Sequence, residues 1–129
     1  MSLKFDPTCR YAKSHEWIRL AGKEGVVGVS DYAQQQLSDV VFVELPEPGD
    51  SFDQGEVYAT VESVKTAGEC YIPMTGEVIE VNEELNNAPQ LVNEDPYGAG
   101  WFARIQISNP GEASSLMDAA AYEKYCATL

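Results

Sequence analysis

The feature that most constrains the fold of this chain is a series of short segments in which apolar and polar residues alternate. A period of two places every second side chain on the same face, as in a β-strand that is buried on one side. Residues 56–62 and 101–107 show this pattern most clearly and predict half-buried antiparallel strands. The expected buried faces carry Val57, Ala59 and Val61 in the first segment, and Trp101, Ala103, Ile105 and Ile107 in the second.

Two further segments are predicted as strands. Residues 77–81 are short and rich in β-branched side chains, which favour strands. Residues 40–45 are almost continuously apolar and are expected to be buried on both faces. Tyr58 lies among the polar positions of its segment and is expected to point away from the core.

Turn sequences separate these segments. Residues 46–50 contain two prolines, which lack the N–H group that a central strand must donate. Residues 53–55 and 73–76 are predicted tight turns, and residues 93–98 a longer loop. Regularly punctuated short strands predict one small β sandwich or barrel, and 129 residues suffice for a single domain.

Two short helices are predicted beside the strands. Ser30 or Asp31 can cap a helix that runs to Leu37, because their side-chain oxygens accept hydrogen bonds from free N–H groups of the first turn. Asp118 can cap a second helix over residues 119–125 in the same way.

The chain is strongly acidic, with a formal net charge of -13. Nucleic-acid binding is therefore not expected, because phosphate contacts require a basic face. An anionic membrane would repel the chain, and no apolar run approaches the length of a membrane span. The start of the chain lacks a secretory signal, which favours a bacterial cytoplasm, or a mitochondrial matrix if a presequence was removed.

The residues that usually build metal or hydrolytic sites are sparse. The three cysteines, Cys9, Cys70 and Cys126, match neither a disulfide framework nor a zinc site, and a reducing compartment is expected. His15 is the single histidine, without the partners of a metal site or a catalytic triad, and is expected to be structural. Cys70 is expected to be a small buried apolar residue.

Lys65 is the most informative single residue. It is the only basic residue between Lys23 and Arg104, a stretch that holds sixteen Asp and Glu residues. One predicted strand ends near Glu62 and extended structure resumes near Cys70, so Lys65 is expected at a hairpin tip with its side chain in solvent. Such a lysine is either an ordinary turn residue or an attachment point for a covalent group.

An ordered set of motifs favours the attachment point. The motifs are Ser14-His15-Glu16-Trp17, residues 28–34 (GVSDYAQ), residues 39–46 (DVVFVELP), residues 61–65 (VESVK), residues 76–82 (GEVIEVN), residues 91–98 (LVNEDPYG) and Gly100-Trp101. Each motif alone is weak, but the set covers the chain from about Tyr11 to Tyr125. In this order it closely resembles the H-protein family of the glycine cleavage system.

The resemblance implies a mainly β fold, a lipoyl/biotinyl-type barrel-sandwich hybrid with short flanking helices. One domain would span residues 1–129, with an N-terminal extension at about residues 1–15 and a helical C-terminal segment at about residues 112–129. Lys65 would carry lipoate in amide linkage, and Glu62-Ser63-Val64 would be the motif read by a lipoate-attaching enzyme. Biotin carriers usually place methionine on both sides of the lysine, whereas Val64 and Thr66 flank it here.

The implied function is that of a carrier and not of an enzyme. The P protein, a glycine decarboxylase, would load an aminomethyl group onto the arm, and the T protein, an aminomethyltransferase, would pass its methylene to tetrahydrofolate. The L protein, a dihydrolipoyl dehydrogenase, would reoxidise the arm. Docking on three partners in turn favours a monomer with weak, electrostatically steered interfaces.

The resemblance also implies a polar cleft that shelters the loaded arm from water, with Ser14, Glu16 and Glu69 in it. A carboxylate there can pair with the ammonium of the aminomethyl group. Glu69 stands where the family usually has aspartate, and Gly68 where serine is common. Cys70 lies close enough to Lys65 in sequence that exchange with the arm is an alternative to a purely apolar role.

Three alternatives remain open. The chain could be a lipoyl relay, or an H-like paralogue that serves another client. It could be an enzyme that uses Lys65 as a Schiff-base nucleophile, which would require a desolvated pocket. It could be an unmodified interaction module, and a lipoyl adduct in the intact mass separates the carriers from the last two classes.

Overall fold

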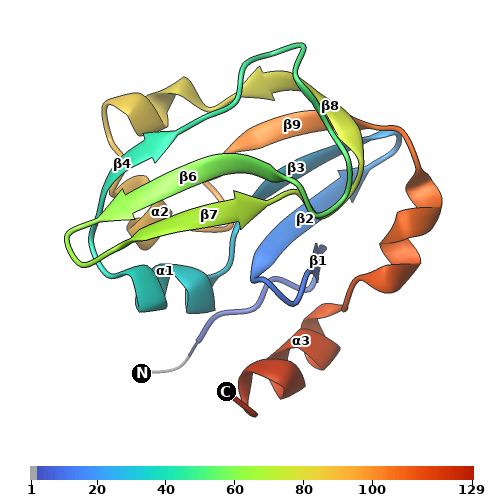
Figure 1. The fold of residues 1–129 in the computed structure, drawn as a ribbon. Coiled ribbons are helices and arrows are strands. Elements are labelled where there is room, and N and C mark those ends of the chain that lie inside the picture. The colour runs from blue at the N-terminus through green and yellow to red at the C-terminus, as the bar shows by residue number, and fades with distance from the viewer. Residues whose placement is uncertain (1–2) are drawn as a thin grey trace.

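The computed structural model describes residues 3–129, which form two β-sheets and several short helices (Figure 1). The predicted mainly β fold is confirmed. In chain order the elements are β1 (Cys9–Tyr11), β2 (Glu16–Ala21), β3 (Glu24–Val29), α1 (Asp31–Leu37), β4 (Val40–Glu44), β5 (Ser51–Phe52), β6 (Val57–Ser63), β7 (Ala67–Tyr71), β8 (Gly76–Val81), the 3₁₀ helix η1 (Glu83–Asn86), α2 (Leu91–Glu94), β9 (Ala103–Ile107), the 3₁₀ helix η2 (Pro110–Ser115) and α3 (Ala119–Cys126).

The strands form two antiparallel sheets. The larger has the order β1-β2-β3-β9-β8-β5, and the smaller has the order β4-β6-β7. In Figure 1 the two sheets lie across from each other as a sandwich, and over residues 3–129 they do not close into a barrel. The β6–β7 hairpin projects at one end of the molecule, next to α1. Strand β4 is an edge of the smaller sheet, so one side of its backbone has no strand partner.

The turns between the strands follow the predicted glycine positions. Gly49 and Gly55 have φ angles of 98° and 89°, which a residue without a side chain adopts at little cost. The N–H of Gly55 donates to the carbonyl of Ile72 at 2.9 Å, so the 53–55 turn is tied to the segment that follows β7.

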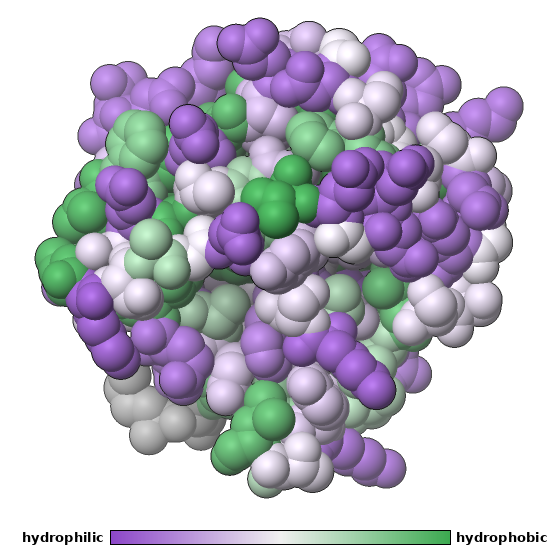
Figure 2. All heavy atoms as spheres, in the orientation of Figure 1, coloured by the Kyte–Doolittle hydropathy of each residue, from purple (hydrophilic) through white to green (hydrophobic). Residues whose placement is uncertain are grey.

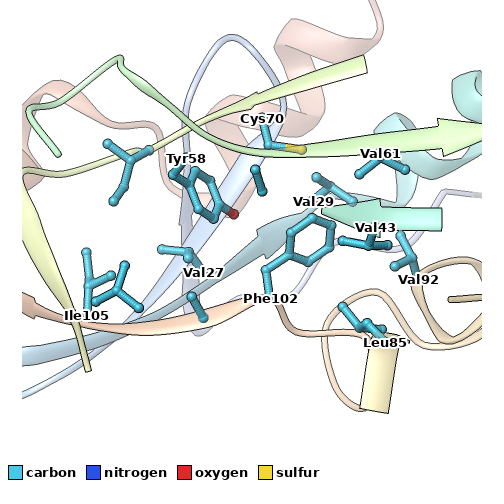
Figure 3. Packing of buried hydrophobic residues seen from close by; sticks show 14 of the residues in the cluster. Val27, Val29, Val43, Tyr58, Val61, Cys70, Leu85, Val92, Phe102 and Ile105 are labelled. Atoms are coloured by element: carbon cyan, nitrogen blue, oxygen red, sulfur yellow. The ribbon is translucent and has the colours of Figure 1, made fainter. Parts of the chain in front are cut away.

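The main core fills the space between the sheets (Figure 3). Its side chains come from both sheets, with Val27 and Ile105 from the larger and Val43 and Val61 from the smaller, all fully buried. Burial of such a side chain stabilises a fold by roughly 1.5–3 kcal/mol. The two sheets are therefore held together mainly by aliphatic packing.

A bulge in β6 overturns the predicted orientation of two side chains. The pairing of β6 with β7 shifts register between Val57 and Ala59, which breaks the strict alternation. Tyr58 turns into the main core beside Phe102, and Val57 is exposed. The predictions that Tyr58 points outward and Val57 inward are wrong for this reason.

A second bulge corrects the prediction for residues 40–45. The pairing of β4 with β6 shifts register between Val40 and Phe42. Val40 and Val43 are buried, but Val41 and Phe42 lie on the exposed face. The segment is therefore not buried on both faces, although nearly all of its side chains are apolar.

The other predicted elements agree with the structure except at two boundaries, whereas β1, β2, β3 and β5 are strands that the sequence patterns did not predict. Ser30 and Asp118 cap α1 and α3 as predicted, accepting from the N–H groups of Ala33 and Ala121. Trp101 lies before β9 and is half-buried, and its neighbour Phe102 is the buried aromatic residue. The predicted loop at residues 93–98 is helical at its start, because α2 ends at Glu94.

A second group of buried residues, the aromatic cluster, joins β1, β2 and α3. It consists of Cys9, Tyr11, Trp17, Tyr122 and Cys126. The rings of Tyr11 and Tyr122 stack at a centroid distance of 4.3 Å, which ties α3 to β1.

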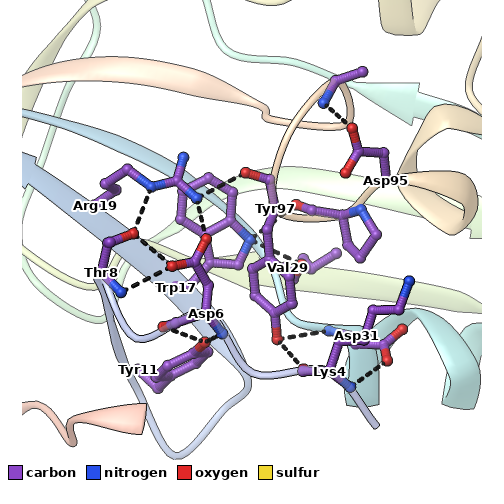
Figure 4. Close-up of polar contacts among 12 residues, drawn as sticks. Lys4, Asp6, Thr8, Tyr11, Trp17, Arg19, Val29, Asp31, Asp95 and Tyr97 are labelled. Atoms are coloured by element: carbon purple, nitrogen blue, oxygen red, sulfur yellow. Dashed lines mark hydrogen bonds and ion pairs between the residues drawn. The ribbon is translucent and has the colours of Figure 1, made fainter.

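Polar contacts fasten the N-terminal segment beside this cluster (Figure 4). Arg19 forms an ion pair with Asp6 at 2.8 Å. The Tyr97 hydroxyl donates to the Lys4 carbonyl, and the Lys4 N–H donates to the Asp31 carboxylate, each at 2.8 Å. These bonds attach residues 4–6 to the sheet and to α1.

Candidate functional site

Lys65 lies exposed in the turn between β6 and β7, at the hairpin tip. The turn is held by Ser63, whose hydroxyl oxygen accepts from the N–H groups of Lys65 at 3.2 Å and Thr66 at 3.0 Å. The N–H of Ser63 donates to the Thr66 carbonyl at 2.7 Å. Ser63 thus stabilises the turn, while the Lys65 side chain is left accessible.

A cavity of about 180 Å³ opens between α1, β2 and β7. All three residues predicted for a cleft, Ser14, Glu16 and Glu69, line it. Lys65 is not part of its wall. The full lining is Ser14, His15, Glu16, Val29, Tyr32, Ala33, Gln36, Leu37, Gly68, Glu69 and Cys70. We call this cavity the cleft.

Glu16 is a buried carboxyl group at the cleft, with only 2% of its surface exposed. It accepts hydrogen bonds from the Ser14 hydroxyl and, at 3.0 Å, from the Tyr71 N–H, which links β2 to β7 across the two sheets. Burial raises the pKa of Glu16 to about 7, because desolvation disfavours its charged form, and the hydrogen bonds offset this only partly. No cation pairs with Glu16 in the described residues.

Glu69 differs from Glu16 although both line the cleft. It is exposed on β7, opposite Thr60 of β6, and forms no ion pair within residues 3–129. Solvent screening weakens any attraction between Glu69 and a bound cation. Glu16 is therefore the carboxyl group with the greater capacity to bind an ammonium ion or to exchange a proton inside the cleft.

His15 belongs to the cleft wall, a position that sequence reasoning did not assign to it. It has a φ angle of 81°, which is uncommon for a residue with a side chain. Its Nδ1 lies 2.8 Å from the Tyr122 hydroxyl, and its ring lies 4.5 Å from that of Tyr32. Burial lowers the pKa of His15.

Further residues that sequence reasoning missed come from α1 and α3. Tyr32, Gln36 and Leu37 of α1 line the cleft, and their spacing along one helical face is the signal that could have found two of them. Tyr122 of α3 lies behind the wall, where its hydroxyl lies 2.7 Å from the Ser30 hydroxyl. A separation of 92 residues leaves no local pattern that would reveal this contact.

The cysteines occupy two different places. Cys70 lines the cleft and is buried, and desolvation raises the pKa of its thiol, so it is a poor nucleophile there. Cys9 and Cys126 are buried in the aromatic cluster, and burial raises the pKa of the Cys9 thiol to about 11. All three are free thiols.

Two other features are absent from residues 3–129. No group of three or more His, Cys, Asp or Glu side chains could hold a metal ion there. None of the helices in that range combines the length and apolarity needed to cross a membrane.

Comparisons with known proteins agree on one family. The family described as Glycine cleavage H-protein matches residues 9–129. The glycine cleavage system H protein of Symbiobacterium thermophilum is 52% identical over 116 residues, which cover 90% of this chain and 91% of that protein. The H protein of Xanthobacter autotrophicus is 56% identical over 120 residues, covering 93% and 96% respectively.

A solved structure supports the same assignment. The crystal structure of a glycine cleavage system H protein from Mycobacterium marinum superposes with a TM-score of 0.84 at 34% identity, covering 95% of this chain and 97% of that one. The matches in sequence and in structure both extend over nearly the whole chain, and the chain therefore belongs to the glycine cleavage H-protein family.

Proposed function

We propose that this chain is the lipoyl carrier of the glycine cleavage system and that Lys65 holds its lipoate in amide linkage. Membership of the family makes the chain a carrier component and not a catalyst. The observation that supports Lys65 as the attachment site is the exposure of its amine at a turn held by Ser63. Acylation would leave residues 24–103 without any Lys or Arg.

The residues present fit such an arm. When bound, lipoate supplies a cyclic disulfide that accepts a carbon group and two electrons and is later reoxidised. The chain supplies an accessible amine and, beside the hairpin, a largely apolar cleft with one buried carboxyl group. The exposed Lys65 lacks the desolvated pocket of a Schiff-base nucleophile, which argues against a catalytic lysine.

Within the cleft, Glu16 would hold the ammonium of the aminomethyl cargo, with Ser14 orienting the carboxyl group. The cleft walls would keep water from the cargo. Glu69, at the exposed side, would contribute a weaker attraction as the cargo enters. Entry of an ammonium would favour the charged form of Glu16, so the carboxyl group would release a proton as the cargo is held.

The partners follow from this role. The P, T and L proteins of the glycine cleavage system would each receive the arm in turn, after a lipoate-attaching enzyme has read Glu62-Ser63-Val64 and acylated Lys65. A net charge of -13 would steer basic surfaces toward a monomeric carrier.

Mass mapping tests the attachment site. The parent chain and Lys65→Arg are incubated with a purified lipoate ligase, lipoate and ATP, and both are digested and mapped. We expect a lipoyl adduct on Lys65 alone in the parent, and none in the variant, because a guanidinium cannot form the amide. Lys65→Arg should unfold at the same urea concentration as the parent, since the residue is exposed. An adduct on another lysine, or no adduct in the parent, refutes the proposal.

A further inference from the structure

Three large apolar side chains are exposed on β4 and on the hairpin turn that carries Lys65. The exposed fractions of Val41, Phe42 and Val64 are 52%, 48% and 68%. Phe42 pairs with Glu62 across β4 and β6, and the N–H of Val64 donates to the Asp39 carbonyl at 3.0 Å. We call Val41, Phe42 and Val64 the apolar patch.

The bulge in β4 produces this patch. Between Val40 and Phe42 the register shifts by one residue, so two consecutive side chains, Val41 and Phe42, reach the surface. In Figure 2, hydrophobic spheres collect on the side of the molecule that carries β4 and the β6–β7 turn. Grouped exposed apolar side chains mark interaction sites more often than scattered ones do.

Acidic residues surround the patch. Asp39, Glu44, Glu62 and Glu69 are exposed on β4, β6, β7 or the loop before β4. None of them forms an ion pair in the described structure, and Lys65 is the only Lys or Arg in residues 24–103. A surface complementary to this one would have an apolar hollow with Lys or Arg residues around it.

We propose that the apolar patch is the docking surface of the enzyme that acylates Lys65, which rests on the proposed attachment site. In that reaction the Lys65 amine loses a proton to a base and attacks the carbonyl carbon of an activated lipoyl group, an acyl adenylate. The C–N bond forms, and the bond to the phosphate oxygen breaks, its electron pair leaving with AMP. An unmodified lysine brings only its four-carbon stem, so the acylating active site must approach the backbone beside Lys65 and cover the patch.

Proteins that act on the chain after lipoylation can reach the arm at a greater distance from β4. Once lipoate is attached, the lysine stem and the acyl chain together carry the reacting sulfur atoms well beyond the hairpin. A partner can then take the arm without covering β4. The patch therefore serves attachment more than it serves the reactions of the finished carrier.

The test compares the double variant Val41→Ser/Phe42→Ser with Leu20→Ser. Leu20 is also an exposed apolar residue, at 38%, but it lies on β2 of the other sheet. Both variants change exposed side chains, and urea unfolding checks that they fold like the parent. Two rates are measured, kcat/KM for lipoylation of Lys65 by a purified lipoate ligase with ATP, and reduction of the fully lipoylated chain by dihydrolipoyl dehydrogenase with NADH.

We expect lipoylation to fall roughly tenfold or more in the double variant and less than about twofold in Leu20→Ser. Reduction of the lipoylated double variant should stay within about twofold of the parent. Unchanged lipoylation, or an equal loss in both reactions, overturns the inference, and so does a concentration-dependent dimer of the parent that the double variant abolishes. A parent that gains no adduct on Lys65 overturns the proposed function first, and this inference with it.

Discussion

The two walls of the cleft are held in different ways. On one side, residues 68–70 belong to β7, whose backbone pairs with β6 along the hairpin. On the other side, His15 and Tyr32 are held by side chains, with the Tyr122 hydroxyl bonded to both His15 and Ser30. One wall therefore depends on a backbone ladder, and the other on an aromatic residue of α3 that is 107 positions away from His15 in the chain.

This difference predicts where substitutions matter. A backbone ladder survives most side-chain changes, because its donors and acceptors are peptide groups. A wall made by hydroxyl and imidazole contacts does not, because one missing atom leaves buried partners unsatisfied. Substitutions in the aromatic cluster should therefore change the cleft more than substitutions of side chains on β7 do.

The largest effect is expected from truncation of one fully buried ring in each cluster. Tyr122→Ala in the aromatic cluster and Phe102→Ala in the main core should each lower the free energy of unfolding by about 3–5 kcal/mol, because each leaves a cavity. Only Tyr122→Ala should also raise the pKa of His15 toward its ordinary value, since it exposes the imidazole.

Urea unfolding and NMR titration of the imidazole measure the two quantities. If either variant is largely unfolded, Tyr122→Leu and Phe102→Leu make the same comparison with smaller cavities. A His15 pKa that moves equally in both variants would contradict the separation of the two clusters.

The second effect concerns pH. Burial raises the pKa of Glu16 from 4.5 to about 7, so the folded chain binds this proton more tightly than the unfolded chain does. The contribution of Glu16 to stability is then fully present below about pH 4.5 and decreases as pH rises toward 7. At about 1.4 kcal/mol per pKa unit, the full loss is on the order of 3 kcal/mol.

Glu16→Gln isolates this contribution. The free energy of unfolding, measured in urea at pH 5 and pH 8, should fall more in the parent than in the variant. His15 titrates in both proteins and cancels from the difference. A difference between parent and variant that is the same at both pH values would mean that Glu16 is not neutralised by burial.

The third effect separates the two carboxylates of the cleft in the loaded carrier. Glu16→Gln should shorten the lifetime of the aminomethyl-loaded arm, without T protein, by roughly tenfold, equivalent to about 1.4 kcal/mol. Glu69→Gln should shorten it by no more than about fivefold, because an exposed pair is worth roughly 0.2–1 kcal/mol. Gln at position 16 can still accept from the Tyr71 N–H, so the link between the sheets is kept.

Release of formaldehyde or ammonia from the loaded carrier reports this lifetime. Reoxidation of the uncharged dithiol by dihydrolipoyl dehydrogenase is the control, and it should change little in either variant. Equal lifetimes for the two variants would show that burial does not distinguish the carboxylates.

Local sequence signals predicted part of the fold, but not the assembly of the cleft. Alternating, apolar and β-branched runs located β4, β6, β8 and β9, four of the nine strands in residues 3–129. Asp, Ser, Pro and Gly located caps and turns, because these signals act within a few residues. The bulge at Tyr58 broke the predicted alternation, and the bulge at Val41 and Phe42 exposed side chains that were predicted to be buried, since a register shift depends on the partner strand. The grouping of Ser14, Glu16 and Glu69 around one cavity was expected from the family resemblance, and no spacing in the chain indicated it.

A smaller effect on the loaded arm than that of Glu16→Gln is expected from removal of a single hydroxyl. Tyr122→Phe keeps the ring that stacks on Tyr11 and removes only the oxygen shared by Ser30 and His15. The Ser30 hydroxyl is fully buried, so the loss should lower the free energy of unfolding by about 1–2 kcal/mol, which is more than an exposed hydroxyl would cost. Ser30 also caps α1, which carries Tyr32 and Leu37 of the cleft, and the change should therefore reach the wall through two routes.

Tyr125→Phe is the matched control, because its ring lies near His15 but its hydroxyl has no part in the network. Urea unfolding and the lifetime of the loaded arm are measured for both. Tyr122→Phe should shorten the lifetime about twofold to threefold and Tyr125→Phe should leave it unchanged. If Tyr122→Phe loses stability but keeps the full lifetime, then α3 supports the fold without shaping the cleft, and the ring contacts of His15 with Tyr32 are sufficient to hold that wall.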